Sequence, residues 1–508
     1  MIKNILEYFE KTVEKHSGKV AVIDGERQIT FYELASNAWA AGNAIYKKSN
    51  GKIKQPVAVF LPKSIECITA DIGIIYSGNA YMNLDVKTPM QRIGNIIKLV
   101  QPAYIITDEK YYDVLKTVYP AEQILLFNNL EKELSEHDIL LQHLEKVIDT
   151  DPLCLINTSG STGTPKSVVL NHKSFVDFTE WALTTTKWTD NEIIGSLSPA
   201  IFDIYSFELC MLMAKSSTIV VIPDTFAAFP VKILQLMEKH KVSFIFWVPT
   251  IMVNIANMDL LSRIPLPDLK MVWFAGEVFP TKQFNYWKRQ LPQTVFVNLY
   301  GPIEITLDCT YFIVNRDIPD NEPLPIGHPC RNTDILILDE NDVLVITPGV
   351  EGELCVRGTS LAMGYYNNPE KTAAAFVQNP LNKSYPEIIY RTGDIVCLND
   401  KNEILFKGRK DSLIKHSGYR IELTEIEHVI VNTLKLVKNG CAVYDFTKKE
   451  IVFFYESEVE KSVADFRKNI GKALPNYMIP TKYIRKDILP RNTNGKIDRL
   501  KLKEEVNQ

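Results

Sequence analysis

LINTSGSTGTPKSVVL, residues 155–170, places a loop rich in Ser, Thr and Gly between two short apolar runs. The runs have the length of strands, and the loop has the composition of a phosphate-binding turn. The Walker A pattern G-x-x-x-x-G-K-[ST] matches at Gly160 and at Lys166-Ser167, but Pro165 stands where the second glycine is required. Because proline has no N–H and a fixed φ, the usual nest of backbone donors cannot form. The sequence therefore indicates a phosphate loop of another kind.

Hydroxyl groups, glycines and one lysine make up this loop. They are Thr158, Ser159, Gly160, Ser161, Thr162, Gly163 and Lys166. Hydroxyl and N–H groups on a turn can wrap a polyphosphate, and the lysine supplies positive charge. For the loop taken alone, a surface turn rich in turn-forming residues is the alternative interpretation.

The bulk composition is that of a globular protein. The chain has 508 residues, too many for one hydrophobic core, so about two to four domains are expected. It is 46% apolar with a net charge of −4, and this balance favours neither a nucleic acid nor a membrane partner. The eight cysteines are scattered, and residues 1–19 read as an amphipathic helix rather than a secretory signal. We therefore expect a cytoplasmic protein.

Short apolar runs separated by helical periodicity predict parallel sheet covered on both faces. The runs lie at 57–60, 103–108, 217–223, 242–249, 269–276 and 294–301. After about residue 325, shorter strands with turn residues predict a small antiparallel unit. A charged junction at 407–418 then precedes enough chain for one small α+β domain. We expect a large N-terminal α/β domain at 1–409, a small C-terminal α+β domain at 410–508, and a hinge near Lys410-Asp411.

Further motifs follow the loop in a fixed order along the chain. They are FAGEVFP at 274–280, NLYGPIEIT at 298–306, GELCVRGTSLAMGYYNNPEKTAAAF at 352–376, YRTGDIV at 390–396, FKGRKDSLIKHSGYRIELTEIE at 406–427, and LPNYMIP and LPRNTNGKIDR within 474–499. Together they resemble the core motifs of the adenylate-forming superfamily, which includes acyl-CoA synthetases, luciferases and the adenylation domains of nonribosomal peptide synthesis. The resemblance implies a large domain of parallel sheets with a small distorted β-barrel, and a small mobile domain.

The resemblance also implies ligase chemistry in two halves. A carboxylate attacks the α-phosphorus of ATP to give an acyl-adenylate and pyrophosphate, and a thiol then attacks the adenylate to give a thioester and AMP. The first half requires that phosphate charge be neutralised. Magnesium shares that work, and Glu304 is the implied ligand, because one carboxylate with phosphate oxygens and waters suits Mg²⁺.

Other motif residues are implied to hold the nucleotide. Tyr300 is expected to stack on adenine, and Asp394 to accept hydrogen bonds from both ribose hydroxyls. The expected ATP- and AMP-binding residues are Thr158, Ser159, Gly160, Ser161, Thr162, Gly163, Lys166, Gly276, Glu277, Asn298, Tyr300, Gly301, Glu304, Asp394, Lys407, Arg409 and Lys496.

Lys496 is the implied catalytic residue. Asn494-Gly495 forms a tight turn that exposes the next side chain. An ammonium group there can bridge the substrate carboxylate and the α-phosphate, two anions that otherwise repel each other. An ordinary exposed turn is the alternative. Asp411 matches the family's hinge, about which the small domain is expected to pivot between the half-reactions.

SPAIFDIYSFEL, residues 198–209, matches the motif by which amino-acid-activating members hold the α-ammonium group, and Asp203 is the matching residue. A carboxylate in an apolar pocket is unfavourable unless a cation meets it, so Asp203 favours an α-amino acid as substrate. A solvated aspartate in a surface loop is the alternative interpretation. Besides Lys496, the expected substrate-site residues are Asp203, Ile204, Phe207, Phe246, Trp273, Ala275, Leu299, Leu307 and Asp308. The large aromatic residues predict a small alanine- or serine-like substrate, of D or L configuration.

Two positions depart from the family's motifs. Ser167 replaces the usual glycine after Pro-Lys, and Ile303 replaces the usual threonine of YGPTE. That threonine hydroxyl normally lies near the adenylate phosphate, and loss of one hydrogen bond to a charged group costs roughly 1.5–3 kcal/mol. We expect slower adenylation, or compensation by Thr306 or a water.

We expect the chain to stand alone, as D-alanine:carrier-protein ligases do, and FTEWAL at 178–183 also resembles those ligases. The expected partner is therefore the phosphopantetheine thiol of a separate carrier protein. An acyl-CoA synthetase for a small carboxylic acid is one alternative. A catalytically silent nucleotide-binding relative is another, and Ile303 is the departure that would suit it. The joint presence of the expected nucleotide-site residues argues against it; they are Lys166, Glu304, Asp394, Arg409 and Lys496.

Overall fold

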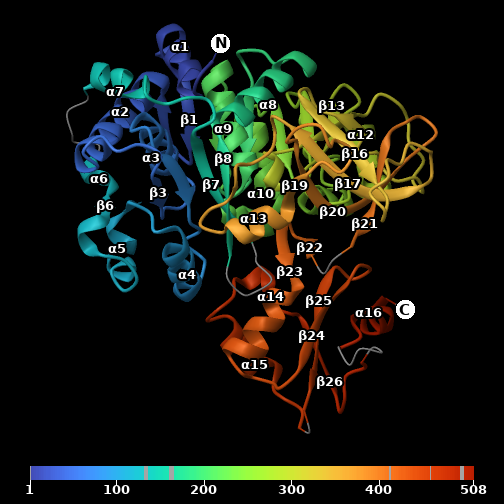
Figure 1. The fold of residues 1–508 in the computed structure, drawn as a ribbon. Helices are drawn as coiled ribbons and strands as arrows, with labels where there is room; N and C mark the ends of the chain where they lie inside the picture. Colours follow the sequence, from blue (N-terminus) through green and yellow to red (C-terminus); the bar gives the residue numbers. More distant parts are fainter. Residues whose placement is uncertain are drawn as a thin grey trace. The chain divides into compact units, whose positions relative to one another are not determined.

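The computed structural model describes residues 2–130, 136–158, 165–410, 413–457, 459–491 and 497–507 (Figure 1). The chain divides into two compact units. The first comprises Met1–Val86, Gln101–Ile156 and Val168–Gly408, and the second comprises Lys87–Val100, Asn157–Ser167 and Arg409–Gln508. The expected boundary after residue 409 and the expected hinge stay predictions, and Asp411 lies outside the described residues.

One sheet contains the strands that flank the phosphate-loop stretch. In spatial order its strands are β18 (Gly364–Tyr365), β8 (Lys166–Asn171), β7 (Pro152–Thr158), β4 (Ala80–Asn83), β3 (Pro56–Val59), β5 (Tyr104–Thr107) and β6 (Ile124–Leu126). The neighbours from β7 through β6 run parallel. The strands predicted at 57–60 and 103–108 are confirmed as β3 and β5.

A second sheet carries the remaining predicted strands. Its order is β15 (His328–Pro329), β14 (Thr310–Ile313), β13 (Val295–Tyr300), β12 (Met271–Phe274), β11 (Phe244–Trp247), β9 (Ile193–Ser196), β10 (Thr218–Val221), β1 (Val20–Asp24) and β2 (Arg27–Thr30). The strands from β13 to β1 are parallel. The four runs predicted between 217 and 301 are confirmed as β10, β11, β12 and β13.

Helices cover this second sheet on both faces. The helices of the described residues are α1 (Leu6–His16), α2 (Phe31–Lys48), α3 (Ile65–Tyr76), α4 (Met90–Val100), α5 (Glu109–Leu115), α6 (Phe127–Leu130), α7 (His137–Leu144), α8 (His172–Thr185), α9 (Asp203–Lys215), α10 (Pro230–Lys239), α11 (Pro249–Asn257), α12 (Thr281–Gln290), α13 (Pro369–Ala375), α14 (Leu423–Glu427), α15 (Val463–Ile470) and α16 (Arg499–Asn507). Ile245 and Val272 face α10, α11 and α12, whereas Phe246 and Trp273 face α8 and α9. Because α8 and α9 share their hydrophobic cluster with β3, β7 and β8, they pack against both sheets.

Residues 333–409 form the predicted antiparallel unit. Its strands are β16 (Thr333–Leu338), β17 (Glu351–Gly358), β20 (Ile388–Leu398) and β19 (Phe376–Gln378), with β21 (Ile404–Arg409) beside β20. The register of β17 against β20 shifts between Glu353 and Cys355, and such a bulge bends a sheet. The expected α/β class with a small curled antiparallel unit is confirmed.

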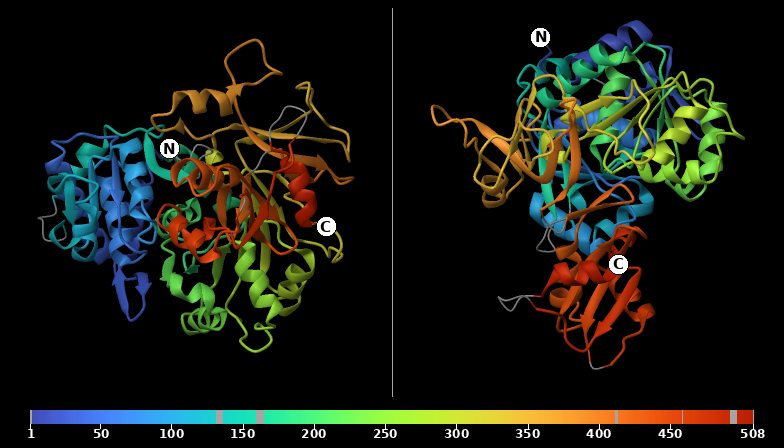
Figure 2. Two further views of the ribbon diagram at one scale, coloured as in Figure 1. Left: turned by 90° about the horizontal axis from the view of Figure 1, so that it is seen from below. Right: turned by 90° about the vertical axis from the view of Figure 1, so that its right-hand side faces the viewer.

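The C-terminal residues of the second unit form a small α+β structure. A hairpin, β22 (Leu413–His416) and β23 (Tyr419–Glu422), precedes the sheet of β24 (Gly440–Asp445), β25 (Glu450–Glu456) and β26 (Lys482–Lys486). Ala442 and Phe453 lie on the face that packs on α14 and α15, and Val443 and Phe454 lie on the face that packs on α16. Figures 1 and 2 show these helices on opposite faces of the sheet.

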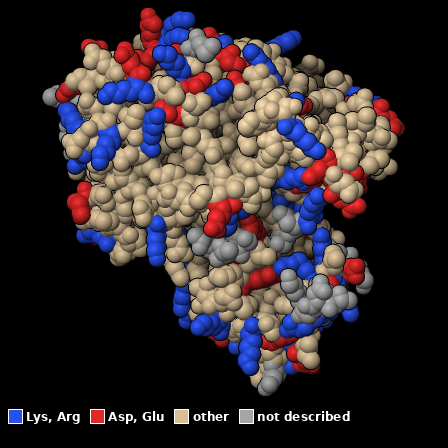
Figure 3. Space-filling model, in the orientation of Figure 1, with Lys and Arg blue, Asp and Glu red and all other residues tan. Residues whose placement is uncertain are grey.

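The face of the molecule drawn in Figure 3 carries charged side chains of both signs, in keeping with the net charge of −4. All eight cysteines are buried free thiols. None of the helices in the described parts of the chain has the length and apolar character needed to cross a membrane.

His172, at the start of α8, makes stability depend on pH. Its ring is buried, and Nδ1 accepts a hydrogen bond from the backbone N–H of Ile5 at 3.3 Å. Burial lowers the pKa of His172 to about 4. An unfolded histidine titrates near 6.5, so between these values only the unfolded state binds the proton. The free energy of unfolding should therefore fall as pH drops from 6.5 to 4, by about 3 kcal/mol from this residue.

Replacement of His172 tests this prediction. His172→Gln keeps an acceptor but cannot titrate, so its unfolding free energy, measured by urea denaturation, should fall less than that of the wild type between about pH 7.5 and 4.5. His328 is exposed, and His328→Gln is the matched control that should keep the wild-type pH dependence. Parallel curves for all three proteins would contradict the assignment.

Candidate active site

Tyr300 and Asp394 meet in the first unit, although 94 residues separate them. Tyr300 ends β13 and Asp394 lies within β20, and the tyrosine hydroxyl donates a hydrogen bond to the Asp394 carboxylate. Burial, with the nearby carboxylate, raises the pKa of Tyr300 well above its usual value, so the hydroxyl stays protonated. The predicted adenine and ribose residues are therefore neighbours, joined by their own side chains.

The turn before Asp394 is held in place by β17. The N–H of Gly393 donates to the Glu353 carboxylate at 3.1 Å, and the Thr392 hydroxyl donates to the carbonyl of Leu354 at 2.7 Å. The N–H of Asp394 in turn donates to Thr392 Oγ1 at 3.0 Å. These bonds orient the carboxylate that the ribose is expected to meet.

Glu304, the expected magnesium ligand, lies in the short 3₁₀ turn after β13 and is wholly buried. Its Oε1 accepts a hydrogen bond from the Tyr365 hydroxyl at 2.8 Å. A buried carboxylate requires donors or a cation, and Tyr365 is one such donor. Among the described residues no group of three or more His, Cys, Asp or Glu side chains could hold a metal ion, and the role of Glu304 as a magnesium ligand stays a prediction.

Other expected nucleotide-binding residues also lie in the first unit. Asn298 Nδ2 donates to the carbonyl of Pro325 at 2.7 Å. Glu277 accepts from the backbone N–H of Thr250 at 3.0 Å, at the N-terminus of α11. Gly301 cannot carry a side chain, because a Cβ there would lie 2.3 Å from the carbonyl oxygen of Leu307. Lys407, by contrast, is exposed.

The predicted substrate-site aromatics form one contiguous cluster. Phe207 and Trp273 stack with ring centroids 5.1 Å apart, and Phe246 lies 5.6 Å from Trp273. Phe178 and Trp181 of α8 join the same cluster. Ile204, Ala275, Leu299, Leu307 and Asp308 are all buried, and Asp203 is partly buried at the first position of α9.

The loop that carries Ile303 has an unusual backbone. Thr306 and Leu307 have φ values of 48° and 64°, a region that non-glycine residues rarely adopt. The Thr306 hydroxyl is buried without a hydrogen-bond partner among the described residues. The compensation expected from Thr306 for the missing threonine at Ile303 therefore stays a prediction.

In the second unit, the phosphate-loop lysine is paired with a carboxylate. Lys166 Nζ lies 2.8 Å from Glu422, and both side chains are largely buried. The Ser167 hydroxyl donates to Asn157 Oδ1, so this departure from the family motif forms an internal contact. Thr158 Oγ1 lies 3.5 Å from the carbonyl of Lys166. A phosphate bound to Lys166 would compete with Glu422.

Several predicted residues cannot be placed. Ser159, Gly160, Ser161, Thr162, Gly163, Asp411 and Lys496 lie outside the described residues. Arg409, which ends β21, belongs to the second unit, whereas Asp394 belongs to the first.

Sequence reasoning missed some contacts that support the site. Tyr365 stands in the GYY of a recognised motif, and only that motif pointed to it. Phe178 and Trp181 have the i, i+3 spacing of one helix face, which is a weak signal for any buried helix. Glu353 is the second residue of the GEL motif but gives no local sign that it binds the turn at Gly393.

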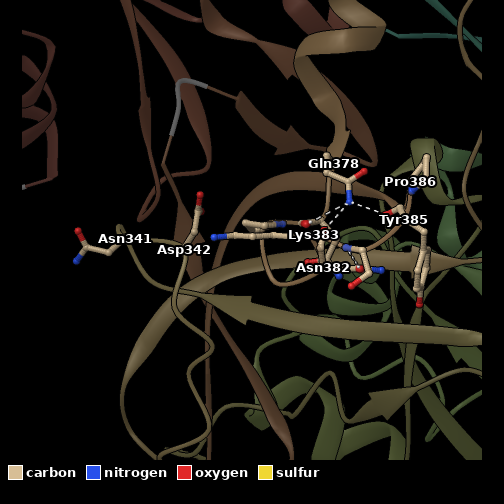
Figure 4. A pocket seen from close by; sticks show the side chains of 10 residues that line it. Asn341, Asp342, Gln378, Asn382, Lys383, Tyr385 and Pro386 are labelled. Carbon is tan, nitrogen blue, oxygen red and sulfur yellow. Dashed lines mark hydrogen bonds between the residues drawn. The ribbon is translucent and has the colours of Figure 1, made fainter.

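A pocket of about 930 Å³ lies away from all of these residues (Figure 4). It is lined by residues 341–342, 378–380 and 382–386, and Gln378 Nε2 donates to the carbonyls of Asn382 and Tyr385. Because this lining side chain already bonds to its own loop, and no predicted site residue is present, the pocket is not part of the candidate site.

Comparison with known proteins agrees with this fold. The family model described as AMP-binding enzyme matches residues 9–366. Gramicidin S synthase 1 of Brevibacillus brevis is 29% identical over 505 residues, which cover 99% of this chain. The chain spans only 44% of that synthase.

Two solved structures share the fold. One is the Vibrio cholerae adenylation domain AlmE in complex with glycyl-adenosine-5'-phosphate, with a TM-score of 0.85 and 19% identity over 99% of this chain and 98% of that one. The other is NpsA-ThdA, an artificially fused adenylation–PCP di-domain from Klebsiella oxytoca, with a TM-score of 0.79 and 21% identity over 96% and 94% of the two chains.

The family match and the sequence relative indicate an adenylate-forming enzyme, a ligase that uses ATP. The chain belongs to the AMP-binding enzyme family, whose model covers well over half of it.

Proposed function

We propose that this enzyme activates a small α-amino acid with ATP and then transfers the aminoacyl group to the phosphopantetheine thiol of a carrier protein. Asp203 carries the proposal. It stands at the first position of α9, beside a cluster of aromatic side chains, where a carboxylate favours a cationic partner. The α-ammonium group of an amino acid is such a partner.

The packing around Trp273 supports a small side chain. Phe207, Phe246 and Trp273 are fully buried and in mutual contact, so they fill volume that a larger substrate would need. Buried Asp308 adds an acceptor that suits a hydroxyl group. The proposed substrate is therefore alanine- or serine-like.

The proposed reaction has two steps, adenylation and thioester formation. The amino-acid carboxylate oxygen bonds to the α-phosphorus of ATP, and pyrophosphate leaves. The carrier thiol, losing its proton, then bonds to the carbonyl carbon, and AMP leaves. Asp394 and Tyr300 would hold the ribose and the base, and Glu304 would hold Mg²⁺, which neutralises phosphate charge when bound. The peptide-synthase relative and the fused adenylation–PCP structure support a carrier as acceptor.

An exchange assay tests the proposal. Purified protein, MgATP and labelled pyrophosphate are incubated with each of the L-amino acids, several D-amino acids, acetate and propionate. We expect label to enter ATP fastest with a small amino acid. Faster exchange with a plain carboxylic acid would instead favour an acyl-CoA synthetase. ATP binding without exchange across the panel would favour a silent relative.

A further inference from the structure

A partly buried lysine holds the backbone that follows β9. Lys63 lies just before α3, and its ammonium donates to the carbonyls of Ser196 at 2.6 Å and Ser198 at 2.8 Å. It also bonds to Ser196 Oγ at 3.1 Å, and that hydroxyl donates to the buried carboxylate of Glu208 in α9. Burial lowers the pKa of Lys63 and raises that of Glu208 to about 7, and each charge offsets the shift of the other. All three ammonium protons of Lys63 are donated in hydrogen bonds, to the two carbonyls and to the Ser196 hydroxyl.

Asn83, the last residue of β4, holds the same segment two residues further on. Its Nδ2 donates to the carbonyl of Ala200 at 3.2 Å and to Asp71 at 2.9 Å. Asp71 lies in α3 and also accepts from the hydroxyl of Tyr205, in the first turn of α9, at 2.6 Å. Asp71 and Tyr205 are wholly buried. Asn83 thus connects the loop and the helix that follows it to the other sheet.

These contacts hold alternate carbonyls, those of residues 196, 198 and 200, immediately before Asp203. Loop backbone without such partners would occupy many conformations, and each would place the first residue of α9 differently. A misplacement of about 1 Å at a binding group can reduce activity about a hundredfold. The segment leading into the proposed ammonium site is therefore held by polar side chains that are buried or partly buried, and these side chains are hydrogen-bonded as burial requires.

We propose that Lys63 and Asn83 are positioning residues, which set the place of the Asp203 carboxylate and hence the recognition of the substrate ammonium group. The proposal rests on the proposed function. Lys63 and Asn83 need not touch the substrate, because they act on the backbone that carries Asp203. Their effect should appear in amino-acid affinity and not in ATP affinity.

Lys63→Met and Asn83→Ala test the proposal by pyrophosphate exchange. We expect the KM for the best amino acid to rise about tenfold or more in each variant, with the KM for ATP within about twofold of wild type. In an Asp203→Asn background the same changes should raise the amino-acid KM no further, because they act through Asp203. Asn83→Ala removes two donated hydrogen bonds, whereas Lys63→Met removes three, and the former serves if the latter does not fold.

Lys19 provides a matched control. Its ammonium also holds two backbone carbonyls, those of Asp190 and Ser216, each at 2.5 Å. These carbonyls precede the first residues of β9 and β10, whereas Ser196 is the last residue of β9. Lys19 therefore acts at the opposite end of these strands. Lys19→Met should leave the amino-acid KM unchanged. An equal rise in Lys19→Met, an equal rise in the KM for ATP, or additivity with Asp203→Asn would overturn the proposal.

Hydrogen exchange separates this proposal from the proposed function. Without any substrate, amides of residues 197–203 should exchange faster in Lys63→Met and Asn83→Ala than in wild type or Lys19→Met. Unchanged exchange would overturn the positioning role even if the enzyme activates amino acids. If the wild type activates no amino acid, the proposed function fails, whatever the amide exchange shows.

Discussion

Asp203→Asn is expected to raise the KM for the amino-acid substrate by about two to three orders of magnitude. The change keeps the size of the side chain and removes its charge. Loss of one partner of a desolvated ion pair costs about 3–5 kcal/mol, because the other charge is left uncompensated. With about 1.4 kcal/mol for each tenfold change, this corresponds to a loss of at least a hundredfold. Steady-state pyrophosphate exchange with varied amino acid measures it.

A substrate that lacks the ammonium group sharpens the test. The des-amino acid of the same carbon skeleton should react poorly with the wild type and lose little more with Asp203→Asn, because it offers no charge to pair. Asp190→Asn is the control, since Asp190 pairs with Lys215 on the surface. If Asp203→Asn left the amino-acid KM unchanged, the argument for an amino-acid substrate would be lost.

Lys496→Ala is expected to lower the rate of adenylate formation about 100- to 1,000-fold. The ammonium group would stabilise the transition state, in which negative charge gathers between the carboxylate oxygen and the α-phosphate. ATP binding should change little, because the ribose, base and remaining phosphates would keep their partners. Single-turnover formation of aminoacyl-AMP measures the rate, and equilibrium binding of ATP measures the affinity.

Lys501 supplies the control for this variant. It is an exposed lysine of α16, close in sequence to Lys496, and Lys501→Ala should behave as wild type. A parallel loss of ATP affinity and of rate in Lys496→Ala would show that the lysine binds ATP or supports the fold instead of acting in the chemical step.

The central strands were predictable because their signal is local. Residues 244–247 and 271–274 lie in strands covered by helices on both faces, so every position is apolar and the run stands out from its neighbours. The antiparallel unit was predictable for a related reason, since its strands are short and separated by turn residues. The register shift at Glu353 gave no such signal, because it depends on the partner strand.

The candidate site was predictable only through its motifs. Spacing alone does not bring Tyr300 to Asp394 across 94 residues, and nothing near Glu304 points to Tyr365. The contacts of Lys63 could not be predicted from the sequence, because a single lysine before a helix is normally a solvated charge. A polar residue becomes a buried partner only when the fold places acceptors around it.

The sequence by itself determined the class of fold, the positions of its central strands and the family. Apolar runs that mark buried strands, and the order of the motifs, are both visible in the order of the residues. The tertiary structure alone decided which polar groups meet: Tyr300 with Asp394, Glu304 with Tyr365, and Lys63 with the backbone before Asp203. The physical reason is the separation along the sequence over which each kind of signal acts. Hydrophobic periodicity depends on neighbours a few residues away, whereas a hydrogen bond depends on where strands and helices distant in the sequence are packed together.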